Sequence, residues 1–302
     1  MDTQYGPLNG HSVGTLMKEA VRRAIEAIRG HRFTFEATAK GRRADGKHTF
    51  VTTADHAAQR VFVKLLREWF PTYGIVAEEG ELSVPCTHPK HDLWFTVDPL
   101  DGTRAFMRRQ SHGIGTMISL VRDGEVVGAC VGDVMTQEVY SARPDGRSVH
   151  RVSEFGIAER LYILEGRTLA DQWLLLRERP HNHSTLVRSM VDNEASPLFA
   201  AVESSGGGSI GIAMARLWKG EVGGAILGPI PRATPWDFYP IMALCARLGF
   251  DFWAIEGTRV WRWLPEVDKA GTPVPHEVLV IHRSRAPELE AWLARSFPVE
   301  PP

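Results

Sequence analysis

The chain has 302 residues, of which 43% are hydrophobic and 24% are charged, and its formal net charge at pH 7 is −1. These values are typical of a soluble globular protein, and they exclude the basic field of a nucleic-acid-binding or polybasic membrane-binding protein. Residues 1–6 lack the pattern of a signal peptide, and no apolar run approaches the ~18 residues of a membrane helix. We therefore expect no nucleic-acid partner and no membrane.

Three cysteines, Cys86, Cys130 and Cys245, are spread along the chain. An odd and widely spaced set argues against a disulfide framework and against a zinc site. We therefore expect reduced structural thiols and a cytoplasmic location.

The first part of the chain alternates between helical and extended patterns. Apolar residues recur at helical spacing over residues 13–29 and 54–69, which predicts two amphipathic helices, and Pro71 ends the second. Between them, residues 33–47 are basic and contain glycine, which predicts a strand and a loop. Residues 50–53 are β-branched or aromatic and predict a short strand.

Two apolar strands then end in acidic residues. Residues 73–77 lead to Glu78 and residues 93–97 lead to Asp98, so both acidic clusters lie at carboxyl ends of strands, where α/β folds usually bind ligands. An antiparallel meander is predicted next, over residues 116–121, 126–134 and 138–142, with a hairpin turn at Asp123-Gly124.

The second half predicts another α/β portion after a polar stretch at residues 143–180. Its predicted strands cover residues 186–190, 222–227, 250–255 and 277–281. Its predicted helices cover residues 194–201, 210–218, 236–248 and 287–295. We expect an α/β (α+β) fold in which an N-terminal part, residues 1–150, and a C-terminal part, residues 151–302, form one compact unit.

The sequence Asp98-Pro99-Leu100-Asp101-Gly102-Thr103 carries the chemistry. Two carboxylates three residues apart, at a strand-to-helix junction, can converge on a hard cation such as Mg²⁺. Gly102 and Thr103 offer backbone N–H groups that suit a phosphate. Taken alone, the same hexapeptide fits a turn with an aspartate N-cap equally well.

Other acidic residues have similarly plain interpretations when each is taken alone. Glu78-Glu79 fits a solvated surface pair, Asp55 fits a helix N-cap, and Asp237 fits a helix-start carboxylate. The glycine run that begins at Gly206 is not a P-loop, because no Lys-Ser/Thr follows it.

Taken in order, these motifs resemble those of the inositol monophosphatase family of Mg²⁺-dependent, Li⁺-sensitive phosphatases. That family carries Val-Thr-x-x-Asp, Glu-Glu, Asp-Pro-(Ile/Leu)-Asp-Gly-Thr and Trp-Asp at comparable spacing. The matching segments are Val51–Asp55, Glu78-Glu79, Asp98–Thr103 and Trp236-Asp237. The resemblance spans residues 13–296 and implies a layered αβαβα sandwich of the inositol monophosphatase and fructose-1,6-bisphosphatase type, and a homodimer.

The resemblance also implies a role for each matching residue. Two or three Mg²⁺ ions would be held by Glu78, Glu79, Asp98, the Leu100 carbonyl, Asp101 and Asp237. Mn²⁺ would replace Mg²⁺, and Li⁺ would inhibit the enzyme. Glu78, Thr103 and Asp55 would position and deprotonate the attacking water. Phosphate and substrate would contact Gly102, Thr103, Gly208 and Ser209.

Details of two motifs resemble the histidinol-phosphate phosphatase branch of the family. These are Asp101-Gly102-Thr103-Arg104-Ala105-Phe106 and Pro235-Trp236-Asp237-Phe238. The pocket departs from the family pattern, because Gly208-Ser209 replaces the Asp of that branch and residues 225–228 lack a substrate-contacting carboxylate. Losing such carboxylates weakens binding of an amine or a polyol hydroxyl.

Three functions therefore remain open. The first is hydrolysis of a small phosphate monoester, such as an inositol phosphate, histidinol phosphate or a related biosynthetic intermediate. The second is hydrolysis of a nucleotide or sugar bisphosphate, which requires extra cationic residues that the sequence does not clearly present. The third is binding of a phosphorylated metabolite without turnover.

Overall fold

The computed structural model describes residues 4–42, 48–163, 166–192, 196–230, 234–271 and 273–297. Its helices are α1 (Gly10–Gly30), α2 (Thr53–Trp69), α3 (Thr103–Met107), α4 (Thr185–Asp192), α5 (Ile210–Trp218), α6 (Pro235–Leu248) and α7 (Ala286–Ser296). Among the described residues, no helix is long and apolar enough to cross a membrane.

An eight-stranded sheet forms the first part of the fold, in the order β10-β9-β8-β7-β6-β5-β3-β4. It contains β3 (Gly74–Ala77), β4 (Leu82–Val84), β5 (Leu93–Asp101), β6 (Gly115–Arg122), β7 (Glu125–Asp133), β8 (Val139–Ala142), β9 (Val149–Val152) and β10 (Ala158–Arg160). Among the strands described for this sheet, only β3 and β5 pair in parallel. The predicted meander is confirmed as β6, β7 and β8, and the sheet continues past residue 150.

A six-stranded sheet forms the second part, in the order β12-β11-β13-β16-β14-β15. It contains β11 (Trp173–Leu176), β12 (Ala201–Ser204), β13 (Gly224–Leu227), β14 (Phe250–Glu256), β15 (Arg259–Arg262) and β16 (Glu277–His282). Strand β11 pairs in parallel with both β12 and β13, so these three strands end at the same edge. A separate hairpin joins β1 (Ala37–Arg42) to β2 (His48–Thr52), and the rest of the predicted loop, residues 43–47, lies outside the described residues.

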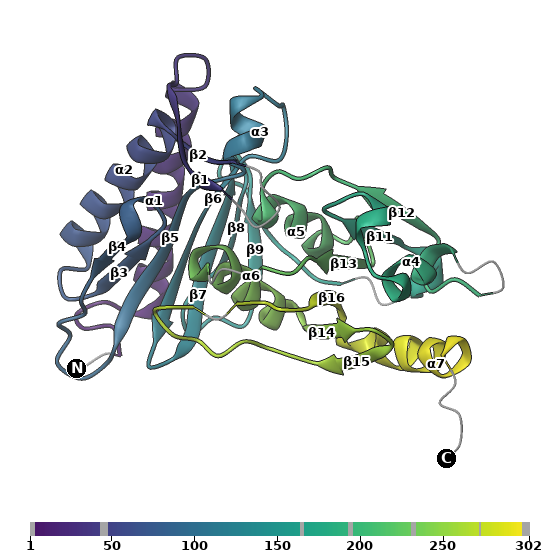
Figure 1. The fold of residues 1–302 in the computed structure, drawn as a ribbon. Coiled ribbons are helices and arrows are strands. Elements are labelled where there is room, and N and C mark those ends of the chain that lie inside the picture. The colour runs from purple at the N-terminus through teal and green to yellow at the C-terminus, as the bar shows by residue number, and fades with distance from the viewer. Residues whose placement is uncertain are drawn as a thin grey trace.

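The helices and sheets stack in five layers, which confirms the predicted αβαβα sandwich (Figure 1). Helices α1 and α2 cover the outer face of the first sheet, α5 and α6 lie between the sheets, and α4 and α7 cover the outer face of the second. Side chains of β5 alternate between two cores, because successive residues of a strand point to opposite faces: Phe95 packs towards α1 and α2, and Trp94 towards α6.

Local signals explain why the first two helices begin where they do. The Asn9 side chain accepts a hydrogen bond from the Ser12 N–H at the start of α1. At α2, Thr52 and Asp55 form a capping box, in which each side chain bonds the other's backbone N–H. The capping box leaves Asp55 buried at the start of α2, beside the sheet edge where β5 ends.

Two predictions for the second half were wrong. Residues 186–190, predicted as a strand, belong to α4, where Leu186, Val187 and Met190 share one buried face. Their spacing of one and four residues fits a helix period, which the short apolar run concealed. The helix predicted over residues 194–201 is not found in its described part: Ala201 begins β12, and residues 194 and 195 lie outside the described residues.

Candidate metal centre

Strand β5 delivers two carboxylates through an irregularity at its end. Asp98 pairs with Met117 of β6 and Asp101 pairs with Gly115, so two residues of β5 face a single residue of β6. This is a β-bulge, a feature that redirects side chains near functional sites. The Leu100 N–H donates to the Asp98 carboxylate over 3.0 Å and fixes its orientation. The bulge therefore lets both aspartates face the same point despite their spacing of three residues.

The structure brings Asp98 and Asp101 together with Asp237, from the first turn of α6. One carboxylate oxygen from each lies within 4.8 Å of the others. Burial raises the pKa of all three carboxyl groups, that of Asp98 well above its usual range and that of Asp101 to about 6. Neighbouring negative charges raise these pKa values further, with Asp237 acting on Asp101 and Glu78 acting on the other two.

This donor set fits a divalent cation. The buried carboxylates of Asp98 and Asp101 and the half-buried one of Asp237 repel one another at such short separation, and burial removes much of the water that would screen them. A hard cation bound to their oxygens offsets both costs, and aspartate oxygens are ligands that Mg²⁺ prefers. We call Asp98, Asp101 and Asp237 the acidic centre.

The adjacent pair Glu78-Glu79 faces a cation of the chain itself. The Lys40 ammonium, on β1, donates to Glu78 and to Glu79 over 2.7 Å each. Gln59 of α2 exchanges two hydrogen bonds with the Glu79 backbone and holds the turn in place. Burial raises the pKa of both glutamates, and Lys40 counteracts this increase. The pair is therefore not a solvated surface pair.

A second network joins Asp55 to the hexapeptide. The Thr103 hydroxyl lies 3.2 Å from the Asp55 carboxylate, to which it donates, and 3.2 Å from the Leu100 carbonyl. Asp55 also accepts hydrogen bonds from the backbone and hydroxyl of Thr52, so it is both a helix cap and a partner of Thr103. Burial raises the Asp55 pKa, and the hydrogen bonds from Thr52 partly oppose that increase.

Asp101 also fastens the acidic centre to α5. Its carboxylate accepts hydrogen bonds from the Ile210 N–H over 3.1 Å and the Gly211 N–H over 2.8 Å, as well as from the Ser209 hydroxyl. Ser209 is itself the N-cap of α5 and is almost fully buried. The positive end of the helix dipole therefore acts on a carboxylate of the acidic centre.

Gly102 permits this close approach of backbones. Its φ is +89°, and a Cβ at this position would lie 2.5 Å from the Gly113 carbonyl oxygen and 2.7 Å from the Ser209 nitrogen. The Ser209 N–H donates to the same Gly113 carbonyl over 2.8 Å. A side chain at residue 102 would therefore separate α5 from the end of β5.

Replacing Ser209 by alanine should weaken Mg²⁺ binding by about 10- to 100-fold, because Asp101 loses a partner that orients it. It should also reduce the free energy of unfolding by about 1 kcal/mol, because α5 loses its cap. Calorimetric Mg²⁺ titration and urea unfolding measure the two effects. Asn9→Ala, which removes the cap of the remote α1, is the matched control and should lose stability alone. Equal Mg²⁺ affinity in Ser209→Ala and the unaltered protein would refute the role of this hydroxyl.

Two cations beside the acidic residues were missed by the sequence analysis. Lys40 lies within the basic segment whose strand and loop were predicted, but its spacing to the glutamates gives no signal. Arg177 follows β11, donates to the Gly208 carbonyl over 2.6 Å, and lowers the pKa of both Asp101 and Asp237 by its positive charge. Only the order of strands in the second sheet brings it to this place.

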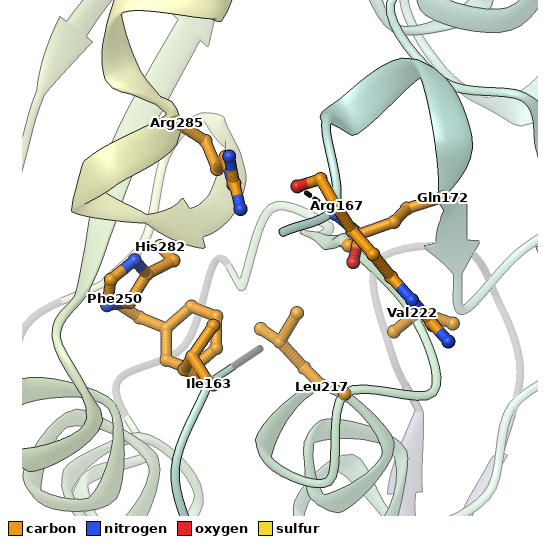
Figure 2. Close-up of a pocket in the computed structure, with 10 residues that line it drawn as sticks. Ile163, Arg167, Gln172, Leu217, Val222, Phe250, His282 and Arg285 are labelled. Atoms are coloured by element: carbon orange, nitrogen blue, oxygen red, sulfur yellow. Dashed lines mark hydrogen bonds between the residues drawn. The ribbon is translucent and has the colours of Figure 1, made fainter. Parts of the chain in front are cut away.

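Two hollows elsewhere in the described structure do not include the acidic centre. The one in Figure 2 lies between residues of α5 and those around β14 and β16, among them Leu217, Phe250 and His282, and its cavity volume of about 20 Å³ has room for one water molecule. The other, of about 420 Å³, is lined in part by Trp173 at the amino end of β11 and by the ion pair of Arg216 with Glu203. Neither lies at the carboxyl ends of the parallel strands.

Curated relatives match parts of this chain. An inositol-1-monophosphatase of Rhizobium meliloti is 40% identical over 101 residues, which are 33% of this chain and 36% of the relative. A protein of Escherichia coli K12 named Nus factor SuhB is 31% identical over 133 residues, 44% of this chain and 47% of the relative. The matched segments thus span less than half the length of these relatives.

Solved structures match the fold over nearly the whole chain. The extragenic suppressor protein SuhB of Bartonella henselae has a TM-score of 0.70 at 18% identity, covering 95% of this chain and all of that one. A dual-specificity IMPase/NADP phosphatase bound to D-inositol-1-phosphate has a TM-score of 0.69 at 16% identity, covering 96% and 98%. The sequence model of the inositol monophosphatase family matches residues 11–297 of this chain. The chain therefore belongs to the inositol monophosphatase family.

Proposed function

We propose that this protein is a Mg²⁺-dependent phosphatase of small phosphate monoesters. The observation that carries the proposal is the acidic centre, in which three carboxylate oxygens from β5 and α6 converge within 4.8 Å. Asp98, Asp101 and Asp237 would hold the metal, together with Glu78 and the Leu100 carbonyl. The dual-specificity relative bound to D-inositol-1-phosphate supports a phosphate ester as the substrate class.

Bound Mg²⁺ supplies positive charge that stabilises the phosphate oxygens and lowers the pKa of water. The chain's own contribution is to orient and deprotonate that water. Because the Thr103 hydroxyl donates a hydrogen bond to Asp55, its oxygen can accept a hydrogen bond from the water. The raised pKa of Asp55 makes this carboxylate a better proton acceptor at the end of the relay.

Glu78 is the second candidate for proton acceptance. Its side chain is 25% exposed, so it borders both the acidic centre and solvent. Burial raises its pKa, which favours proton uptake, and the positive charge of Lys40 opposes that increase. Backbone N–H groups of Gly102 and Thr103 remain the proposed phosphate contacts, and Glu79 a proposed ligand of a further ion through water.

Phosphate release from a panel of esters tests the proposal. Inositol phosphates, histidinol phosphate, sugar phosphates and nucleotides are incubated with Mg²⁺, and in parallel with EDTA. Turnover of at least one ester that EDTA abolishes is the expected result. No release from any ester, in protein shown by calorimetry to bind Mg²⁺, would contradict it.

A second candidate is binding of a phosphorylated metabolite without turnover. The apolar stretch Ala225-Ile226-Leu227 at the end of β13 favours it, because no carboxylate there meets the leaving group. Some relatives carry the name Nus factor SuhB rather than that of an enzyme. Motif details around Arg104 and Phe238 place histidinol phosphate among the first esters to try.

A further inference from the structure

An arginine lies where the second sheet meets the acidic centre. Arg177 directly follows Leu176, which pairs in parallel with Ile226 of β13 and with Ser204 of β12. Arg177 therefore leaves the sheet at the edge where β12 and β13 also end. Ligands of open α/β sheets bind outside this edge.

The side chain of Arg177 reaches the backbone that supports the acidic centre. It donates to the Gly208 carbonyl over 2.6 Å, and Gly208 precedes Ser209, which donates to Asp101. Arg177 is thus held, half-buried, on the side of the site formed by the strand ends of the second sheet. We call this side the C-terminal wall.

The neighbouring strand β13 contributes only apolar side chains and glycine. At the end of β13, Ile226 and Leu227 are buried and apolar, and Gly228 has no side chain. A substrate hydroxyl or amine would find no carboxylate on β13, while the adjacent strand end carries a guanidinium. Such a planar cation suits a carboxylate or phosphate far better than a neutral polyol.

We propose that Arg177 binds a second anionic group of the substrate, so that this protein prefers phosphate monoesters that also carry a carboxylate or another phosphate. This specificity role rests on the proposed phosphatase function. It gives the C-terminal wall the cationic residue that the sequence alone did not clearly present for such substrates. Arg177 acts on substrate choice, while the chemical step stays with the residues around Asp98 and Thr103.

Matched esters test the proposal. Glucose 6-phosphate is compared with 6-phosphogluconate, and fructose 6-phosphate with fructose 1,6-bisphosphate, by kcat and KM in Mg²⁺. The unaltered protein should prefer the member with the second anionic group, 6-phosphogluconate or fructose 1,6-bisphosphate, in at least one pair. The pair that shows the preference identifies this group as a carboxylate or a phosphate. Arg177→Met should reduce that preference in kcat/KM by about 10- to 100-fold, mainly through KM.

Arg179→Met removes an exposed arginine two residues away and should keep the preference. Arg177→Lys keeps the charge without the planar fork, and an intermediate preference is expected. It also serves if the methionine variant does not fold. An unchanged preference in a folded Arg177 variant would overturn the proposal. So would a preference of the unaltered protein for glucose 6-phosphate and fructose 6-phosphate, which lack the second anionic group.

Failure of the proposed function gives a different result. In that case the unaltered protein releases no phosphate from any ester, whatever residue occupies position 177. Calorimetric binding of 6-phosphogluconate and glucose 6-phosphate is therefore measured alongside turnover. If 6-phosphogluconate binds more tightly than glucose 6-phosphate, and Arg177→Met abolishes this difference, the role of Arg177 is supported even without turnover. Equal binding of the two esters to the unaltered protein refutes it.

Discussion

Asp98→Asn should lower kcat for phosphate release by about 10³-fold or more, because loss of a carboxylate that would hold the metal removes several kcal/mol of metal-dependent stabilisation. The same change should make the metal-free protein more stable at pH 8, by about 1–3 kcal/mol. Asparagine has nearly the same shape and can still accept the hydrogen bond from the Leu100 N–H. It carries no charge to repel Asp101, Asp237 or Glu78.

Opposite signs for activity and stability make this prediction specific. Steady-state phosphate release and urea unfolding in EDTA are measured on the same preparation. Asp133→Asn is the control, since Asp133 is a buried carboxylate of β7 that accepts hydrogen bonds from Met135 and Thr136 and does not belong to the acidic centre. It should retain turnover and should not gain stability. An Asp98→Asn protein less stable than the unaltered one in EDTA would show that repulsion does not dominate this centre.

The parts of the site that the sequence predicted are those encoded by contiguous residues. Asp98 and Asp101 share one bulged strand end, and Thr103 follows on the same turn, so a hexapeptide contains their relation. Asp55 depends only on the start of α2, where a capping box is readable from Thr52 and Asp55. Asp237 was placed by the order of family motifs, and its convergence with β5 required the packing of α6 against the first sheet.

The parts that could not be predicted depend on pairing between distant segments. Arg177 reaches the centre because β11 lies between β12 and β13, an order that no local pattern specifies. Lys40 meets Glu78 and Glu79 because the hairpin of β1 and β2 folds over the end of β3. The misassigned segment at Leu186 shows the complementary difficulty, since a run of a few apolar residues fits two periods until its packing partners are known.

Raising the pH should destabilise the metal-free protein and strengthen its stabilisation by Mg²⁺. The pKa of Asp101 is raised from 3.8 to about 6 in the folded state. A carboxyl group with a raised folded pKa contributes stability that is complete below its unfolded pKa and is lost as the pH rises through its folded pKa. Asp101 alone should therefore cost the metal-free protein on the order of 3 kcal/mol between pH 4 and pH 7.

Mg²⁺ reverses this dependence because it binds the ionised carboxylates, so binding releases protons and tightens as the pH rises. The difference in unfolding free energy between Mg²⁺ and EDTA should grow steadily from pH 5 to pH 8, as measured by urea unfolding at each pH. Asp101→Asn should flatten the metal-free curve. Asp123→Asn should leave it unchanged in this range, because a backbone hydrogen bond from Asp92 lowers the pKa of that exposed carboxyl.

A metal-free protein whose stability rises between pH 5 and pH 7, with the same slope in Asp101→Asn, would mean that the acidic centre is not under repulsion. The two curves also separate binding from catalysis, because neither requires a substrate. If Mg²⁺ stabilises the protein increasingly with pH and yet no ester is hydrolysed, the acidic centre binds metal without supporting turnover, which favours the second candidate function of binding a phosphorylated metabolite. Unfolding curves measured without substrate thus separate metal binding at the acidic centre from turnover of a bound ester.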